Sequence, residues 1–178
     1  MSDAYYPPPA FSFTVAVIGS ATALSLLTRI DASFQDISGI EAEFLTEEVI
    51  EGGENRFVHR LPTHGKYPNL VLKRGAVTRD SFLLEWVGQT VGSGMSLPIL
   101  PQNMLVTLLN ESGTPSIAWA FANAYPIKTS VSSLNSEDNK ILIETMELSY
   151  NYFERVNLGG AASAAGKVAA LTARLQKG

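Results

Sequence analysis

Apolar and polar residues alternate along much of this chain, and a period of two residues is typical of strands with one buried face. Short apolar runs that end at Gly, Pro, Asn or charged residues are typical of buried strands. The stretches with one of these patterns are 11–17, 30–38, 40–47, 70–72, 104–109, 116–121 and 140–152. We therefore expect a mainly β fold whose final strand is 140–152.

The strongest helical pattern follows the apolar run at 70–72. Asp80 or Ser81 can cap this helix, because a short side chain with an oxygen accepts hydrogen bonds from the free N–H groups of the first turn. Gly92 and Gly94 can end it. The residues that recur at helical spacing on one broad face are Phe82, Leu83, Trp86, Val87 and Thr90. We expect this to be the only substantial helix in the β domain, covering one side of a β layer.

The segments between these elements are rich in residues that favour turns. Residues 110–114 and 135–139 predict turns between strands, and 123–126 predict a turn that leads the chain out of its strand. Residues 49–68 contain Gly, Pro, Asn and His without a clear strand pattern. Long connections of this kind are usually functional or disordered, so we expect an extended loop that reaches a partner.

These patterns divide the chain into an arm, a domain and an extension. Residues 1–10, with consecutive prolines, predict an extended N-terminal arm. Residues 11–157 predict one β domain, and 158–178 predict an Ala- and Gly-rich C-terminal extension. A narrow helical stripe in the extension consists of Val168, Leu171 and Leu175. We expect a flexible linker there and a short helix that frays or docks.

The composition suggests a surface that other subunits cover. Hydrophobic residues make up 46% of the chain and charged residues only 17%, against about a quarter in ordinary proteins. An ordinary compact β domain is the alternative. The net charge of −4 makes the chain a poor general binder of nucleic acid. The absence of cysteine excludes disulfides, thiolate catalysis and cysteine zinc sites, and is compatible with a reducing cytoplasm.

No targeting segment stands out at the start of the chain. Residues 10–28 carry no charge and are rich in apolar side chains. The segment before them has no Lys or Arg, and Gly19, Ser20, Thr22 and Ser25 interrupt the run. An export signal needs a basic start, so we expect neither a signal peptide nor a membrane span.

The candidate chemistry is weak throughout the sequence. Asn55, His59 and His64 could suggest a metal, but two histidines in a loop without cysteine are more typical of solvated side chains. Residues 161–167 lack the first glycine of a phosphate loop, and Val168 replaces its Ser or Thr. A row of glutamates suggests a solvated or channel-facing surface instead of catalytic carboxylates, and consists of Glu41, Glu43, Glu47, Glu48, Glu51 and Glu54. We expect no catalytic residue, cofactor or metal.

The order of several short motifs resembles the contractile-tail tube protein family. The matching segments are 34–41 with Glu43, 51–55, 69–75 with the helix that follows, 119–128 and 143–150. The resemblance implies a β-sandwich or barrel subunit with one helix. Six copies would form a ring whose strands join into one continuous inner β-barrel, and rings would stack into a tube. Such closure removes exposed strand edges. The segment 19–33 looks longer than the family's first connection, and the extension after Leu158 has no counterpart.

The resemblance also implies partners and a subunit interface. The tube would be a homohexamer enclosed by a contractile sheath, with baseplate and tail terminator proteins at its ends and DNA or protein cargo in its lumen. It would assemble in the cytoplasm and then belong to a virion tail or to a released or anchored injection particle. The expected interface residues are Gly52, Gly53, Asn55, Lys73, Arg74, Gly75, Asn123 and Lys128. Glu41 and Glu43 are candidates to face the lumen, and Trp86 and Trp119 are expected core anchors.

Lys73 and Arg74 carry the sharpest expectation, because they follow the strand 70–72 at its rim. We expect both to offer charge to acidic residues of the next subunit, so that reversing both charges leaves a folded subunit that assembles poorly. Two other functions remain open: a baseplate or tube-initiator ring of the same fold, and a small β-barrel that binds a ligand or acts as an enzyme. The sequence does not distinguish phage tail from injection system, or DNA from protein cargo.

Overall fold

A computed structural model describes residues 12–18, 29–50, 52–53, 56–76, 81–94, 96–133, 141–158, 166–167, 170 and 173–174. Its strands are β1 (Ser12–Ile18), β2 (Arg29–Phe34), β3 (Asp36–Ser38), β4 (Glu43–Val49), β5 (His59–Lys66), β6 (Leu70–Gly75), β7 (Gln102–Leu109), β8 (Pro115–Val131), β9 (Ile143–Ser149) and β10 (Tyr152–Asn157). One longer helix, α1 (Phe82–Thr90), lies between β6 and β7. The prediction of a mainly β fold with one substantial helix in the β domain is confirmed.

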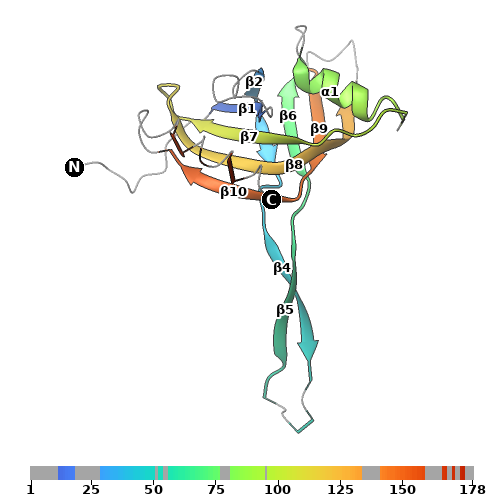
Figure 1. Ribbon diagram of the computed structural model, residues 1–178, viewed down its shortest axis with the longest axis vertical. Coiled ribbons are helices and arrows are strands. Elements are labelled where there is room, and N and C mark those ends of the chain that lie inside the picture. Colours follow the sequence, from blue (N-terminus) through green and yellow to red (C-terminus); the bar gives the residue numbers. More distant parts are fainter. Residues whose placement is uncertain are drawn as a thin grey trace, which may run out of the picture.

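The main sheet curves around a core. Its strand order is β2-β1-β7-β8-β9-β6-β3, and β10 also pairs with β8. Only Gln35 separates β2 from β3, and its backbone N–H donates to the carbonyl of Lys73 on β6, at 2.9 Å. The two ends of the strand order are therefore neighbouring parts of one chain segment. The result is a barrel-like sandwich with β1, β7, β8 and β10 on one side and β6 and β9 on the other (Figure 1).

Strand β8 links the two layers and corrects two predictions. Its register pairs the first half with β7 and β10 and the second half with β9. The predicted turn at 123–126 is wrong: Asn123 has a φ of 51° and bends the strand, but the strand continues. Pro126 lacks an N–H and lies at a register shift, where a ladder tolerates it. The predicted final strand 140–152 is also wrong, because β10 follows β9 and extends to Asn157.

Strands β4 and β5 form a separate two-stranded hairpin that projects far from the body (Figure 1). The prediction of an irregular loop at 49–68 is therefore wrong, since β5 occupies most of its second half. Every residue of both strands is exposed. The alternation at 40–47 predicts β4, but β5 has no such pattern, and neither of its faces is buried in the subunit.

Helix α1 begins at the predicted cap. The side chain of Ser81 accepts a hydrogen bond from the backbone N–H of Leu84, at 3.4 Å. The helix covers one open side of the curved sheet, as predicted, and packs against β8 and β2 (Figure 1). Its buried residues, Leu83, Trp86 and Val87, join the main core. That core is filled by large side chains from the inner faces of both layers, among them Leu70, Leu72, Met104, Phe121, Met146 and Leu148.

Replacing Trp86 with alanine should lower the free energy of unfolding by about 3–5 kcal/mol, because it leaves a large cavity under α1. Trp86 is 5% exposed, and its indole N–H has no hydrogen-bond partner in the described part of the chain. Trp86→Phe removes this unpaired donor and keeps an aromatic ring, so it should cost clearly less than alanine. Urea denaturation of the isolated subunit measures both. Equal losses for Ala and Phe would contradict this role.

Candidate assembly surfaces

The β4–β5 hairpin is held together by contacts between its own strands. Glu43 and Lys66 form an ion pair at 2.9 Å. Glu48 and Arg60 form a second one at 3.2 Å. The hydroxyl of Thr63 donates to the carbonyl of Leu45 at 2.9 Å. Exposed ion pairs contribute at most about 1 kcal/mol each, so these contacts fix the register more than they stabilise the hairpin.

The hairpin and its ends carry large apolar side chains on the surface. Phe44 is 73% exposed, Ile50 79%, Phe57 53% and Leu61 53%. Leu45, Val49 and Val58 are also exposed. Several large apolar side chains exposed on one projecting element are typical of a surface that contacts another protein. The hairpin therefore has the chemistry of an interface.

The candidate interface and metal residues that the structure describes in segment 49–68 lie on this hairpin. Gly52 and Gly53 form an exposed turn at its tip, where Gly53 has a φ of 97°. Asn55 lies outside the described residues. His59 and His64 lie on β5 rather than in a loop, and both are exposed. Among the described residues, no group of three or more His, Cys, Asp or Glu side chains could hold a metal ion.

Glu41 and Glu43, the two residues predicted to face the lumen, lie at the base of the hairpin. Glu41 is exposed and directly precedes β4. Glu43 is exposed at the first position of β4, where Lys66 partly neutralises it. Both carboxylates are therefore accessible on the subunit.

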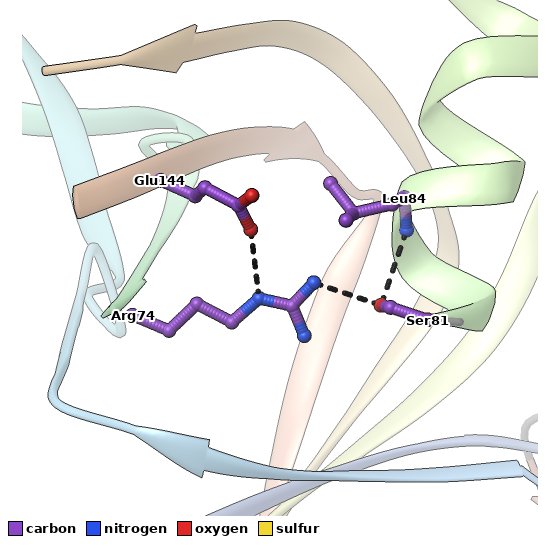
Figure 2. Close-up of polar contacts among 4 residues, drawn as sticks. All are labelled: Arg74, Ser81, Leu84 and Glu144. Carbon is purple, nitrogen blue, oxygen red and sulfur yellow. Dashed lines mark hydrogen bonds and ion pairs between the residues drawn. The ribbon is translucent and has the colours of Figure 1, made fainter. Parts of the chain in front are cut away.

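Lys73 and Arg74, adjacent on β6, have different environments. Lys73 is part-exposed and pairs with Asp36 of β3 at 2.7 Å. Arg74 is 1% exposed; its Nε donates to Glu144 of β9 at 3.2 Å, and its Nη2 donates to the hydroxyl of Ser81 at 2.8 Å (Figure 2). The guanidinium also lies 5.6 Å from the ring centre of Phe34. The expectation that Arg74 offers its charge to a neighbouring subunit is therefore wrong, because its guanidinium is buried and binds Glu144 and Ser81 of its own subunit.

The remaining expected interface residues lie on the main body. Gly75 ends β6 and is half-buried, next to Ile141. Asn123 is exposed at the bend of β8, and its backbone N–H donates to the side chain of Asn103 at 3.0 Å. Lys128 is exposed on the second half of β8 and pairs with Glu147 at 2.6 Å. The structure does not bring these residues together with the hairpin.

Trp119, the second expected anchor, is half-buried on β8 and packs against the main core.

An aromatic cluster at the base of the hairpin has no signature in the sequence pattern, because its members are far apart along the chain. The hydroxyl of Tyr150 donates to the carbonyl of Gly39, at 3.0 Å, just before β4. The ring of Tyr67, just after β5, lies 6.0 Å from that of Tyr150. Phe121 and Phe153 complete the cluster. Gly39 has a φ of 86°, and a side chain there would collide with the Asn69 carbonyl. Tyr150 thus ties both ends of the hairpin to the core.

The tyrosine contact predicts a loss of stability at alkaline pH. Burial, with the nearby Tyr67 and Glu41, raises the pKa of Tyr150 from 10.0 to about 12. Its neutral hydroxyl stabilises the fold fully below pH 10.0, and this contribution is lost as the pH rises towards about 12, because the unfolded chain releases the proton first. The free energy of unfolding of the native protein should therefore approach that of Tyr150→Phe across this range. A constant difference between the two would contradict the assignment.

Comparisons with known proteins agree with these features. The sequence model of the family described as T4-like virus tail tube protein gp19 matches residues 9–154. No curated protein matches the sequence of the chain. None of the helices in the described ranges has the length and hydropathy that crossing a membrane requires.

Solved structures share the fold. A chain of the anti-feeding prophage baseplate is 24% identical, with a TM-score of 0.70 over 90% of this chain and 100% of that chain. A chain of an extracellular contractile injection system, in the sheath-tube complex in its extended state, is 21% identical, with a TM-score of 0.67 over 86% and 94%. Hcp1 from Flavobacterium johnsoniae is 15% identical, with a TM-score of 0.51 over 84% and 96%.

The family match covers most of the chain, and the fold and the projecting apolar hairpin suit a protein that assembles with other subunits. The chain therefore belongs to the T4-like virus tail tube protein gp19 family, and it is a structural tube subunit, not an enzyme.

Proposed function

We propose that this subunit forms hexameric rings that stack into the inner tube of a contractile tail or injection particle. The observation that carries the proposal is the β4–β5 hairpin, which projects from the body and exposes Phe44, Ile50, Phe57 and Leu61 (Figure 1). Such a surface is unfavourable in a free subunit and becomes favourable when a second copy covers it. A contact between unlike surfaces of identical subunits closes into a ring or continues as a filament.

Strand edges on the body support the same assembly. The second half of β8, residues 127–131, is exposed, with Ile127 at 39% and Val131 at 54%. Within the described residues, this half pairs only with β9, and β10 pairs only with β8. Free edges of this kind can accept a strand of a neighbouring copy. Pairing them around a ring would give the continuous inner barrel that the resemblance implies.

The assemblies in which the relatives were solved suggest partners for this subunit. Those proteins were solved in a baseplate, a terminating cap and a sheath-tube complex. By analogy, this tube would carry a contractile sheath outside, a baseplate and a terminator at its ends, and DNA or protein in its lumen. Glu41 and Glu43, both exposed at the hairpin base, remain the candidates to face that lumen. The subunits would assemble in the cytoplasm before joining the particle. Gly52, Gly53, Lys73, Gly75, Asn123 and Lys128 remain candidate contacts between subunits.

Size-exclusion chromatography and negative-stain electron microscopy of the purified chain test this proposal. We expect rings that stack into tubes as the protein concentration rises. Single rings that never extend would favour a baseplate or tube-initiator ring, which the likeness to a baseplate chain keeps as the second candidate. A monomer that stays monomeric across protein and salt concentrations would contradict both.

A further inference from the structure

The β4–β5 hairpin continues two strands of the body in the same register. On the body, Asp36 of β3 pairs with Lys73 of β6. Seven residues further along the first strand and seven residues back along the second, Glu43 of β4 pairs with Lys66 of β5. The two pairs of strands therefore belong to one long antiparallel ribbon, and the hairpin is the end that projects from the body (Figure 1).

The ribbon is interrupted where it leaves the body, at residues 39–42 and 67–69, which we call the ribbon break. Gly39 has a φ of 86°, outside the strand region, and Pro68 has no N–H to donate to a ladder. A few residues at the ends of such elements can absorb changes in φ and ψ, as a hinge does. Beyond the break, β4 and β5 are exposed along their whole length. The direction of the hairpin therefore depends on contacts at the break.

Tyr150, which lies between β9 and β10, contacts both strands of the ribbon at the break. Its hydroxyl donates to the carbonyl of Gly39 at 3.0 Å, and its ring centre lies 6.0 Å from that of Tyr67. Tyr150 is 7% exposed, and its ring meets that of Phe121 edge to face, 4.9 Å away, in the main core. The ring of Tyr67 also meets that of Phe153 on β10, at 6.1 Å. One buried side chain thus holds both strands where their own ladder is interrupted.

Other contacts at the break involve one strand or join the two strands to each other. Ile40 packs against the main core. Gly39 approaches the carbonyl of Asn69 so closely that a side chain at this position would collide with it. Tyr150 differs from these residues because it belongs to the body and contacts both strands.

We propose that Tyr150 is a positioning residue for assembly, which acts through Gly39 and Tyr67 to fix the direction of the hairpin before a second copy binds it. This inference rests on the proposed function, in which the hairpin is a contact between copies. A direction that is fixed during folding removes this ordering cost from assembly. If only about a tenth of the subunits held the hairpin in the binding direction, the apparent affinity would be about tenfold weaker.

The absence of cysteine in the chain allows the direction of the hairpin to be measured in the full-length protein. Glu47→Cys on β4 and Glu111→Cys in the turn between β7 and β8, both at exposed positions, each take one nitroxide label. Pulsed electron paramagnetic resonance gives the distribution of distances between the labels in dilute, unassembled subunits. We expect one narrow distribution in the native background. Tyr150→Phe, which keeps the ring and loses only the hydroxyl, should at least double its width, and so should Tyr67→Ala.

Assembly of the same variants without labels connects the direction of the hairpin to the proposed function. Light scattering on dilution gives the protein concentration at which tubes form, and Tyr150→Phe should raise it at least tenfold. The matched control is Val106→Ala, a change in the main core on β7, which pairs with β1 and β8 and not with the ribbon. This control should lower the melting temperature at least as much as Tyr150→Phe does. It should nevertheless leave the distances and the assembly concentration close to their native values.

The two measurements separate this inference from the proposed function. Native distance distributions in both Tyr150→Phe and Tyr67→Ala would overturn the inference, and so would equal broadening in Val106→Ala. A broad distribution in Tyr150→Phe together with a native assembly concentration would also overturn it, because the direction of the hairpin would then not limit assembly. If the native chain forms no tubes or rings, the proposed function fails, and the distances alone decide whether Tyr150 holds the hairpin.

Discussion

Replacing Phe44 and Leu61 with aspartate should abolish tube formation and leave the subunit folded. Phe44 is 73% exposed and Leu61 53%, so neither contributes much to the core of its own subunit. Burying a large apolar side chain against a partner stabilises a contact by about 1.5–3 kcal/mol. The double change should therefore weaken each contact by at least about 100-fold. Electron microscopy would show single subunits or small oligomers, while circular dichroism and the melting temperature stay close to those of the native protein.

A control variant on the same hairpin distinguishes the loss of an apolar contact from a change in the structure of the hairpin itself. Glu48→Ala with Arg60→Ala removes an ion pair whose side chains are 56% and 70% exposed, and this should cost at most about 1 kcal/mol. This variant should still form tubes. Normal tubes from the double aspartate variant would show that the hairpin is not an assembly surface.

Elements with one buried face could be predicted from the sequence. Strand β1 alternates because Val15 and Val17 enter the main core. Helix α1 carries a capping serine and an apolar stripe that the sheet covers. Alternation predicts β4 within 40–47 but not its partner β5, which is exposed on both faces and has no alternating apolar pattern. The family resemblance is the basis for the proposed assembly, because the contacts that we propose for the hairpin lie between chains.

Arg74 is a candidate interface residue whose predicted role is wrong. Charged residues after an apolar run usually mark the surface, so Lys73 and Arg74 looked equivalent. Strand β6 nevertheless alternates, and Arg74 lies on the buried side with Leu70 and Leu72. That period was visible in the sequence. Its partner Glu144 was not, because it lies on β9, 70 residues away, and is brought close only by the sheet register.

Replacing Arg74 with alanine should be one of the most destabilising single changes in this subunit. The guanidinium joins β6, β9 and the cap of α1, and its loss leaves the carboxylate of Glu144, 14% exposed, without this cation (Figure 2). Breaking a buried ion pair in this way costs about 3–5 kcal/mol. For a domain of this size, the melting temperature should fall on the order of 10 °C. Scanning calorimetry of the isolated subunit measures this.

Lys73→Ala is the matched control, because Lys73 neighbours Arg74 on the same strand and its ion pair with Asp36 is 43% and 49% exposed. It should cost at most about 1 kcal/mol. Reversing both charges of Lys73 and Arg74 should therefore prevent stable folding, because it buries a carboxylate beside Glu144, and not merely impair assembly. In contrast, Arg74→Met with Glu144→Leu removes both buried charges and should recover much of the loss. If Arg74→Ala costs no more than Lys73→Ala, the buried pair does not hold the layers together.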